Sequence, residues 1–436
     1  MTSHTYIKLI TIVLLTLLIA PLSAAKQKPY NIIVILADDI GVEAFGSYGG
    51  TSFGTPNIDQ LAIEGMRFDY AHAQPLCTPS RVKLMTGQYN FRNYERFAYL
   101  NASLPTFAQP LQKKGYATAI IGKWQLYKSS RDKNGKIQGM LPENAGFSEH
   151  LMWQVKELGS RYWQPRLQDN GTVKTFNKEE YGPTLFNDRA LQFIEKNKTQ
   201  PFLLYYPMVL PHDPFVTTPD EQEVYDNQSK YGAMVRYMDK MVGNIKNKVE
   251  TLGLKENTLI LFVGDNGSSR RIFSMQNGNK IKGAKGFTVN YGTHVPFIAW
   301  GGPTKAGSIN RSLVDFNDVY PTVLELANIK NKKQFDGISL KPALLDNSTH
   351  QRDAIFIHYD PKWGEHLFKP ARYAFNRTWK LYKNGRFFNL ENDPLEKNDL
   401  SLTSLNQREL NAKLQLQKLI DSKRNSPNWL IPATYQ

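Results

Sequence analysis

Four short runs of apolar residues alternate along the chain with segments whose apolar positions recur at helical spacing. The runs cover residues 32–37, 117–121, 202–206 and 259–263. Each is apolar at consecutive positions, which is typical of central strands buried on both faces of a parallel sheet. The pattern therefore predicts an α/β fold in which helices sandwich a central, mostly parallel sheet.

Polar or charged residues lie just beyond each of these runs. They are Asp38-Asp39 after the first, Lys123 after the second, Pro211-His212-Asp213 after the third and Asp265-Asn266-Gly267 after the fourth. In open α/β sheets, ligands bind beyond the carboxyl ends of the strands. We therefore expect these residues to meet in one functional site.

The chain changes pattern after about residue 350. Residues 373–390 alternate between apolar and polar positions around a turn at Lys383-Asn384-Gly385, which predicts an antiparallel hairpin. Residues 406–422 have leucines at helical spacing. We expect a catalytic domain over residues 26–349, and a small C-terminal subdomain with an antiparallel hairpin and a terminal helix over residues 350–436.

The N-terminus has the pattern of a secretory signal peptide. Lys8 precedes an apolar run over residues 9–20, and small residues follow at Ser23-Ala24-Ala25. The run is short for a membrane span, so we expect residues 1–25 to be removed and the protein to be secreted or periplasmic, without stable membrane insertion. An uncleaved N-terminal anchor is the alternative.

Composition narrows the classes of partner. The chain has 54 Lys and Arg residues against 39 Asp and Glu, a formal net charge of +15, which favours an acidic partner. Because the basic residues are scattered rather than clustered, the sequence does not favour a nucleic-acid binder. Cys77 is the one cysteine, so the protein has no internal disulfide.

Two groups of residues are candidates for chemistry. Cys77 opens a run of helical character that Gly87 ends, with Pro79 suited to a first helical position. Such a helix N-terminus favours an anion, although a lone cysteine is more often buried and inert. Hard oxygen ligands for Ca²⁺ or Mg²⁺ are offered by Asp38, Asp39, Asp265 and Asn266. Taken alone, Asp38-Asp39 also fits a helix cap or a turn.

The segment Cys77-Thr78-Pro79-Ser80-Arg81 resembles the Cys-X-Pro-Ser-Arg signature of the type I sulfatases, the formylglycine-dependent branch of the alkaline phosphatase superfamily. The resemblance covers residues 30–400 in the family's order. It includes the segments Ala37-Asp38-Asp39, Thr55-Pro56-Asn57-Ile58-Asp59, Gly122-Lys123-Trp124, Pro211-His212-Asp213-Pro214-Phe215, Asp265-Asn266-Gly267, Lys285-Gly286 and Phe388-Asn389-Leu390-Glu391-Asn392-Asp393-Pro394.

This resemblance implies a mechanism. A maturation enzyme would oxidise Cys77 to formylglycine, whose hydrate attacks the sulfur of a sulfate ester and then expels sulfate from the covalent intermediate. The implied ligands of a Ca²⁺ ion, with Mg²⁺ as the alternative, are Asp38, Asp39, Cys77, Asp265 and Asn266.

The resemblance also implies roles for the other site residues. Lys123 and Lys285 would neutralise the transferred group, Arg81 would orient the diol, and His212 would protonate the leaving oxygen. Taken singly, the lysines also fit solvated surface residues, and His212 fits a turn residue.

Two departures from the family pattern bear on this mechanism. Gln125 stands where the family has a histidine that is thought to take the diol proton, and an amide cannot act as a base near neutral pH. Another group, such as a metal-bound carboxylate, then serves as the base, or sulfate expulsion is slow. The segment Asn290-Tyr291-Gly292-Thr293-His294 replaces a Glu-Gly-Gly-X-Arg pattern, and we expect it to pack behind the site, with His294 a weak candidate for a further role.

We expect the substrate to be a sulfated polysaccharide or its oligosaccharides. The segment Arg161-Tyr162-Trp163-Gln164-Pro165-Arg166 combines rings that stack on sugars with arginines that bind sulfate, although the rings also fit a role in covering the core. Two alternatives remain: a phosphoester hydrolase of the same superfamily, and a sulfated-glycan-binding protein that turns over little because of Gln125.

Overall fold

The computed structural model describes residues 29–128, 138–330, 335–349, 352–364 and 366–423. The predicted signal peptide, residues 1–25, lies outside these ranges. Within them, no helix combines the length and the apolar character needed to cross a membrane.

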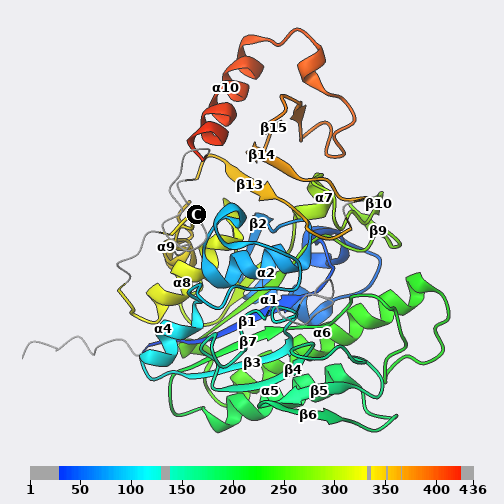
Figure 1. The fold of residues 1–436 in the computed structure, drawn as a ribbon, viewed down its shortest axis with the longest axis vertical. Coiled ribbons are helices and arrows are strands. Elements are labelled where there is room, and N and C mark those ends of the chain that lie inside the picture. The colour runs from blue at the N-terminus through cyan, green and yellow to red at the C-terminus, as the bar shows by residue number, and fades with distance from the viewer. Residues whose placement is uncertain (1–28, 129–137, 331–334, 350–351, 365, 424–436) are drawn as a thin grey trace, which may run out of the picture.

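A ten-stranded sheet forms the centre of the molecule (Figure 1). Its strands, in spatial order, are β12 (Ser308–Asp315), β2 (Met66–His72), β11 (Phe297–Trp300), β8 (Thr258–Gly264), β1 (Asn31–Ala37), β7 (Phe202–Pro207), β3 (Ala117–Lys123), β4 (Glu149–Trp153), β5 (Arg166–Asp169) and β6 (Thr172–Thr175). The four apolar runs of the sequence are β1, β3, β7 and β8, and they are parallel neighbours. The α/β prediction is therefore confirmed.

Helices cover both faces of this sheet because its central strands are apolar on both sides. Alternate residues of β1 belong to two different cores, Ile32 and Val34 to one and Ile33 and Ile35 to the other. The first core includes residues of α2 (Cys77–Thr86), α4 (Ala108–Lys113), α8 (Val319–Leu326) and α9 (Lys341–Asp346). The second includes residues of α1 (Pro56–Glu64), α5 (Gly182–Lys196) and α6 (Asn227–Thr251).

Three smaller elements lie around the sheet. They are the helices α3 (Asn90–Asn93) and α7 (Asn290–Thr293) and the two-stranded ribbon of β9 (Phe273–Gln276) and β10 (Asn279–Lys282). Residues 283–289, which include Lys285, connect β10 to α7.

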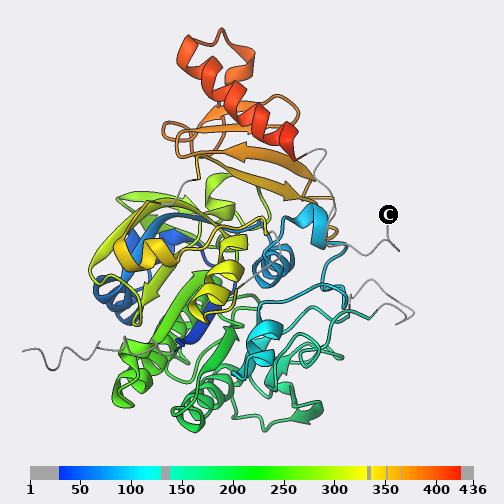
Figure 2. The same ribbon diagram turned by 90° about the vertical axis from the view of Figure 1, so that its left-hand side faces the viewer.

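A separate four-stranded antiparallel sheet follows, as the sequence predicts for the C-terminal region (Figure 2). Its strands are β13 (Ile355–Tyr359), β14 (Ala371–Phe375), β15 (Trp379–Tyr382) and β16 (Phe387–Asn389). The antiparallel hairpin predicted around Lys383-Asn384-Gly385 is present as β15 and β16. It does not extend back to residue 373, because Asn376 accepts backbone hydrogen bonds at a further turn that separates β14 from β15.

The two faces of the C-terminal sheet pack against different partners. Helix α10 (Gln407–Ser422) covers the outer face through Ala412, Leu416 and Ile420. The inner face packs on the main body, where Leu76 and Leu313 join its core. Leu76 directly precedes α2, so this contact brings the C-terminal sheet close to the start of that helix.

Candidate active site

The carboxyl ends of four neighbouring strands deliver the polar residues that the sequence singled out. Asp38 and Asp39 follow β1, Lys123 ends β3, His212 lies after β7, and Asp265 and Asn266 follow β8. Because β8, β1, β7 and β3 are adjacent and parallel, these residues meet at one edge of the sheet. The expected convergence is confirmed.

The acidic residues form a connected, buried group. The backbone N–H of Asp39, which has a φ of 66°, donates a hydrogen bond to Asp265 Oδ1 at 3.0 Å. Asn266 Nδ2 donates to Asp39 Oδ1 at 2.9 Å. The left-handed backbone at Asp39 turns the chain so that successive carboxylates, Asp38 and Asp39, both serve the site. The interpretation of Asp38-Asp39 as only a helix cap or turn is therefore wrong.

Burial sets the protonation of these carboxylates. Burial and the neighbouring Asp38 raise the pKa of Asp265 well above its usual value. Burial also raises the pKa of Asp39, against the opposing effect of Lys285. For Asp38, burial acts in the same direction, but the charge of Lys123, with His212 and Lys285, outweighs it and lowers the pKa. Three ionised carboxylates would exceed the charge of the two lysines, and the raised pKa values of Asp39 and Asp265 show that full ionisation is costly without a further cation.

The site fits a hard divalent cation. Asp265 Oδ2 and Asn266 Oδ1 are buried and have no hydrogen-bond partner, which is costly for oxygens that ligate nothing. Ligand atoms of Asp38, Cys77 and Asp265 lie within 4.8 Å of one another, as do those of Asp38, Asp39 and His212. Carboxylate and amide oxygens are the ligands that Ca²⁺ and Mg²⁺ prefer.

Two lysines are fixed by the acidic residues. Lys123 Nζ lies 2.7 Å from Asp38 Oδ2 and 3.0 Å from Oδ1, and its side chain is fully buried. Lys285 Nζ lies 2.5 Å from Asp39 Oδ2. Burial alone would lower the pKa of Lys285, but Asp39 raises it, so this lysine carries its charge at neutral pH. Neither is a solvated surface lysine, so that alternative is wrong.

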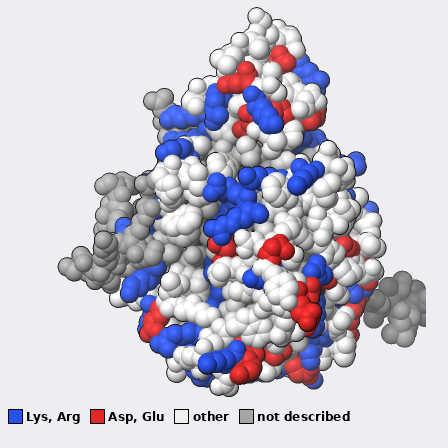
Figure 3. Space-filling view, turned by 90° about the vertical axis from the view of Figure 1, so that its right-hand side faces the viewer, with Lys and Arg blue, Asp and Glu red and all other residues white. Residues whose placement is uncertain are grey.

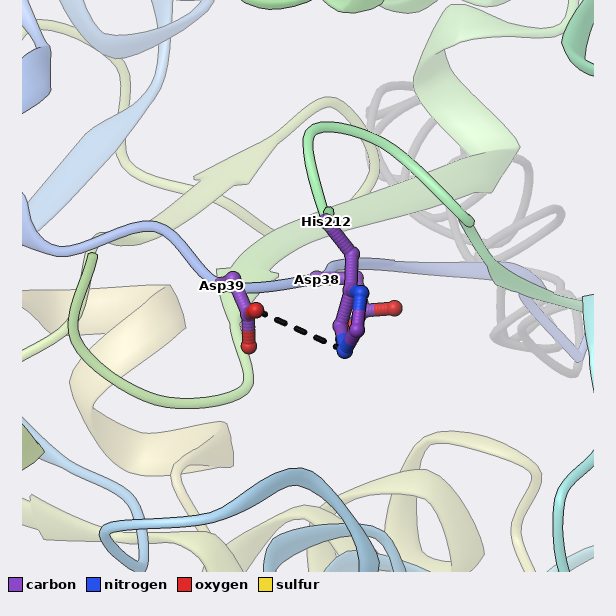
Figure 4. Close-up of side chains that lie close together, drawn as sticks. All are labelled: Asp38, Asp39 and His212. Carbon is purple, nitrogen blue, oxygen red and sulfur yellow. Dashed lines mark ion pairs between the residues drawn. The ribbon is translucent and has the colours of Figure 1, made fainter. Parts of the chain in front are cut away.

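His212 points its ring at the same group (Figure 4). Its Nε2 lies 3.1 Å from Lys285 Nζ and 3.5 Å from Asp39 Oδ2. Burial, then Lys285, lowers the pKa of His212 well below its usual value. His212 therefore belongs to the charged group, and the interpretation of it as only a turn residue is wrong.

Arg161 is a site residue for which the sequence suggested only a substrate contact. Its Nη2 lies 2.8 Å from His212 Nδ1, and its guanidinium stacks 4.3 Å from the Trp153 ring. The neighbouring Tyr162 is buried and donates its hydroxyl to Val209 O at 2.8 Å. Tyr162 therefore supports the His212 loop from within the core, whereas Arg161 contacts the histidine directly.

Cys77 begins α2 beside this group. Its side chain is buried, and its Sγ donates to Gln125 Oε1 at 3.5 Å. Burial raises the pKa of this thiol, so the unmodified cysteine is a poor nucleophile at neutral pH. Pro79 lies two residues inside the helix rather than at its first position, and Gly87 ends the helix with a φ of 68°, as expected.

Arg81 connects α2 to the end of β3. Its Nη2 donates to the carbonyl oxygens of Lys123 and Trp124, whereas its buried Nε has no partner. These contacts fix the position of Lys123 relative to Cys77. His294 lies apart from the acidic group: it stacks on His72 with ring centroids 5.0 Å apart, and its Nε2 contacts Asp69 O at 2.8 Å.

Known proteins share both the sequence pattern and the fold. Residues 30–329 match the sequence profile of the family Sulfatase, and residues 284–425 match that of the C-terminal region of N-sulphoglucosamine sulphohydrolase. Arylsulfatase G of Rattus norvegicus is 32% identical over 373 residues, 75% of this chain and 70% of the relative. N-acetylgalactosamine-6-sulfatase of the same species is 28% identical over 404 residues, 84% of this chain and 75% of the relative.

Solved structures agree with this likeness. Ps i-CgsB superposes with a TM-score of 0.76 and 26% identity, covering 92% of this chain and 93% of that one. The phosphonate monoester hydrolase of Agrobacterium radiobacter, with a TM-score of 0.67 and 18% identity over 91% of this chain and 95% of its own, shares the fold. From the profile over residues 30–329 and the identity with Arylsulfatase G, the chain belongs to the sulfatase family, whose members hydrolyse sulfate esters.

Proposed function

We propose that this sulfatase is exported and removes sulfate groups from a sulfated polysaccharide or its oligosaccharides, with residue 77 as the nucleophile. The observation that carries the proposal is the position of Cys77, within 4.8 Å of ligand atoms of Asp38 and Asp265 and under the charges of Lys123 and Lys285. A nucleophile at this position lies beside carboxylates that can hold a cation and beside two ammonium groups. Positive charges of this kind stabilise an anionic ester.

The choice of a glycan rests on charge and on relatives. The net charge of +15 suits a polyanion better than a small aryl sulfate. One relative is named N-acetylgalactosamine-6-sulfatase. Ps i-CgsB has been solved in complex with k-i-k-neocarrahexaose. That structure is 26% identical to this chain and superposes with a TM-score of 0.74, covering 94% of this chain and 96% of its own.

Two groups beyond the encoded side chains supply the reactive chemistry. Oxidation of Cys77 by a maturation enzyme supplies, as a hydrated aldehyde, the hydroxyl that attacks sulfur. Asp38, Asp39, Asp265 and Asn266 would hold a divalent cation, which would supply a positive charge to acidify this hydroxyl and to stabilise the sulfate group.

Lys123 and Lys285 stabilise the transferred group. Their ammonium groups are held in place by Asp38 and Asp39 before substrate arrives, so little reorganisation is needed as negative charge moves during the reaction. Arg81 fixes the end of β3 and with it Lys123. We assign these three residues to charge stabilisation and positioning.

His212 and Lys285 form the proton-donating pair. His212 Nε2 lies 3.1 Å from Lys285 Nζ, so the leaving alcohol oxygen can take its proton from the ring or from the ammonium group beside it. The other ring nitrogen, Nδ1, lies 2.6 Å from Asp213 O and 2.8 Å from Arg161 Nη2, and these contacts keep Nε2 directed at the site. Gln125 contacts Cys77 Sγ but has no basic nitrogen, so a carboxylate of the acidic group takes the proton in the sulfate-expelling step.

A release assay on the protein co-expressed with a maturation enzyme tests this function. We expect sulfate release from at least one of carrageenan, chondroitin sulfate, heparin and fucoidan oligosaccharides, and turnover of 4-nitrophenyl sulfate at least ~10²-fold above that of 4-nitrophenyl phosphate. Faster phosphate turnover would identify a phosphoester hydrolase. Binding of a glycan without release, with formylglycine at residue 77 verified by peptide mass, would identify the binding protein that Gln125 favours.

Export has its own test. Fractionation of the native host should recover the protein outside the cytoplasm with its N-terminus at Lys26, after the small residues Ser23-Ala24-Ala25. An intact N-terminus at Met1 on membrane-bound protein would instead identify an anchor.

A further inference from the structure

The C-terminal sheet carries a pocket of about 440 Å³ that the proposed mechanism does not use. It lies where β13 ends and β14 begins, beside the turn between β15 and β16. Its lining includes three cations, Arg372, Lys383 and Arg386, together with His358, Asp360 and Tyr382. We call these six residues the basic pocket. Its volume is in the range of sites for small ligands.

In the described part of the chain, the cations of the basic pocket contact groups other than carboxylates. Among the residues that the structure describes, none of the three lies within 4 Å of a carboxylate oxygen as an ion pair. Arg372 Nε donates instead to His358 Nδ1 at 2.8 Å. The Arg386 guanidinium lies 4.3 Å from the centroid of the Tyr382 ring. The one acidic residue of the pocket, Asp360, is paired with Lys362 at 2.7 Å.

His358 is uncharged at neutral pH, so it does not add a fourth positive charge to the basic pocket. Burial, then Arg372, lowers its pKa to about 4, with smaller contributions from Lys362 and Lys383 and an opposing one from Asp360. The ring is therefore neutral at neutral pH, and it accepts the hydrogen bond from Arg372. An arginine held in this way presents its remaining N–H groups in a fixed plane, which suits an oxyanion.

The basic pocket is joined to the active site through one segment of chain. Tyr359, which also lines the pocket, donates its hydroxyl to Gly286 O at 3.0 Å, and Gly286 follows Lys285. Tyr382 and Thr288 share a hydroxyl hydrogen bond of 2.7 Å. Tyr359 and Tyr382 thus join the pocket to residues 286–288 from the inner face of the sheet. Arg372 and Lys383 lie toward the outer face, beside the end of α10, so a glycan that reaches them from the active site passes around the edge of the sheet. On the face seen in Figure 3, Lys and Arg side chains gather where the C-terminal part meets the main body.

We infer that the basic pocket is a second anion subsite, which binds another sulfate group of the same glycan chain whose target sulfate lies in the active site. This inference rests on the proposed function, since it takes a sulfated glycan as the substrate. A chain that carries one sulfate fills the active site alone. A more highly sulfated chain also places a sulfate among Arg372, Lys383 and Arg386 and binds more tightly.

Calorimetric titration of the Cys77→Ala protein tests the subsite without turnover. The ligands are size-matched chondroitin tetrasaccharides with four sulfates, one sulfate or none, and sodium sulfate. The test variant adds Arg372→Gln, Lys383→Gln and Arg386→Gln. The control variant adds Arg408→Gln, Lys305→Gln and Lys178→Gln, which remove the same charge from exposed positions outside the pocket.

We expect the test variant to bind the four-sulfate chain about tenfold more weakly (~1.4 kcal/mol) and the one-sulfate chain within about twofold of the parent. The control variant should bind both like the parent. Equal affinity of the test variant and its parent for the four-sulfate chain, or an equal loss with every chain, would overturn the inference. So would a parent that does not bind the four-sulfate chain.

The remaining arms separate the alternatives. Binding of sodium sulfate that the test variant alone loses would overturn the glycan subsite in favour of a free-anion site. Thermal unfolding verifies that each variant is folded, and Arg386→Gln alone, an exposed substitution, should give part of the loss.

If matured wild-type protein releases no sulfate from any glycan while the test variant shows the tenfold loss, the proposed function fails and the subsite stands.

Discussion

Lys123 and Asp38 form an ion pair from which water is excluded, since neither side chain exposes more than 1% of its surface. A buried pair of this kind contributes little net stability, but the removal of one partner is costly because it leaves the other charge buried alone. At the residue scale, the site is thus a set of charges that depend on one another. We expect this arrangement to serve the sulfate group at some cost in stability.

Lys123→Met tests this dependence. In chelator-treated protein we expect a loss of about 3–5 kcal/mol in the free energy of unfolding, because Asp38 is left without its cation. The double variant Lys123→Met/Asp38→Asn should recover most of this stability without any recovery of sulfate release. Lys174→Met, which breaks the exposed pair with Asp169, should cost at most ~1 kcal/mol. A Lys123→Met protein as stable as wild type by urea unfolding would contradict the account.

Gln125→His tests the origin of the base. The backbone at this position has a φ of 50°, which histidine tolerates, and the side chain already contacts Cys77 Sγ. An imidazole there supplies a base that the amide lacks, so we expect kcat for sulfate release to rise at least ~10-fold at neutral pH. Gln125→Leu serves as the control of similar size. An unchanged kcat in Gln125→His would show that sulfate expulsion does not limit turnover.

At the element scale, the loops after β1 and β8 are held together by the hydrogen bond from Asp39 N to Asp265 and by that from Asn266 to Asp39. Both loops carry carboxylates whose pKa values are raised by burial. A cation bound between the loops offsets the repulsion between their carboxylates. Metal should therefore stabilise the ends of β1 and β8 together.

Metal removal tests this coupling. Readdition of CaCl₂ or MgCl₂ at about 100 times the dissociation constant should stabilise EDTA-treated protein by ~2.7 kcal/mol, seen as a rise of several degrees in Tm. Asp265→Asn should abolish most of this rise, whereas Asp69→Asn, at a carboxylate that is paired with Arg67 outside the site, should leave it unchanged. No rise with either metal would contradict the assignment of the acidic group.

His358, in strand β13, should make the stability of the protein depend on pH. His358 has a folded-state pKa of about 4, below the unfolded value of 6.5, so the unfolded state binds more protons between these values. The contribution of neutral His358 is therefore fully present above pH 6.5 and is lost as pH falls toward 4.

Comparison of urea unfolding at pH 7 and pH 4.5 measures this contribution. Wild-type protein should lose more stability than His358→Gln, by at most ~3 kcal/mol because the ring is partly exposed. The amide of the variant can still accept from Arg372. Equal losses in the two proteins would show that the ring is protonated without cost.

On the scale of the whole molecule, the two sheets meet close to Cys77 and Lys285, two of the residues proposed for catalysis. The inner face of the C-terminal sheet contacts Leu76, next to Cys77, and Tyr359 bonds to Gly286, next to Lys285. The C-terminal part therefore borders the candidate site.

The sequence predicted the parts of this arrangement that depend on local pattern. Strands that are apolar on both faces identify the sheet, and the polar residues beyond their ends identify Asp38, Lys123, His212 and Asp265 as neighbours. Arg161 contacts His212 from a loop about 50 residues away in the chain, and no local pattern encodes that contact. The turn at Asn376 was missed because the alternation of apolar residues continues through it.

The most direct test of the account is sulfate release by matured wild-type protein against Cys77→Ala made in the same host. The substrate is the glycan that the release panel favours, sulfate is measured by ion chromatography, and peptide mass verifies formylglycine at residue 77. We expect release by wild type and none above background from Cys77→Ala. Equal release by the two proteins would contradict the account, because the chemistry would then not depend on residue 77.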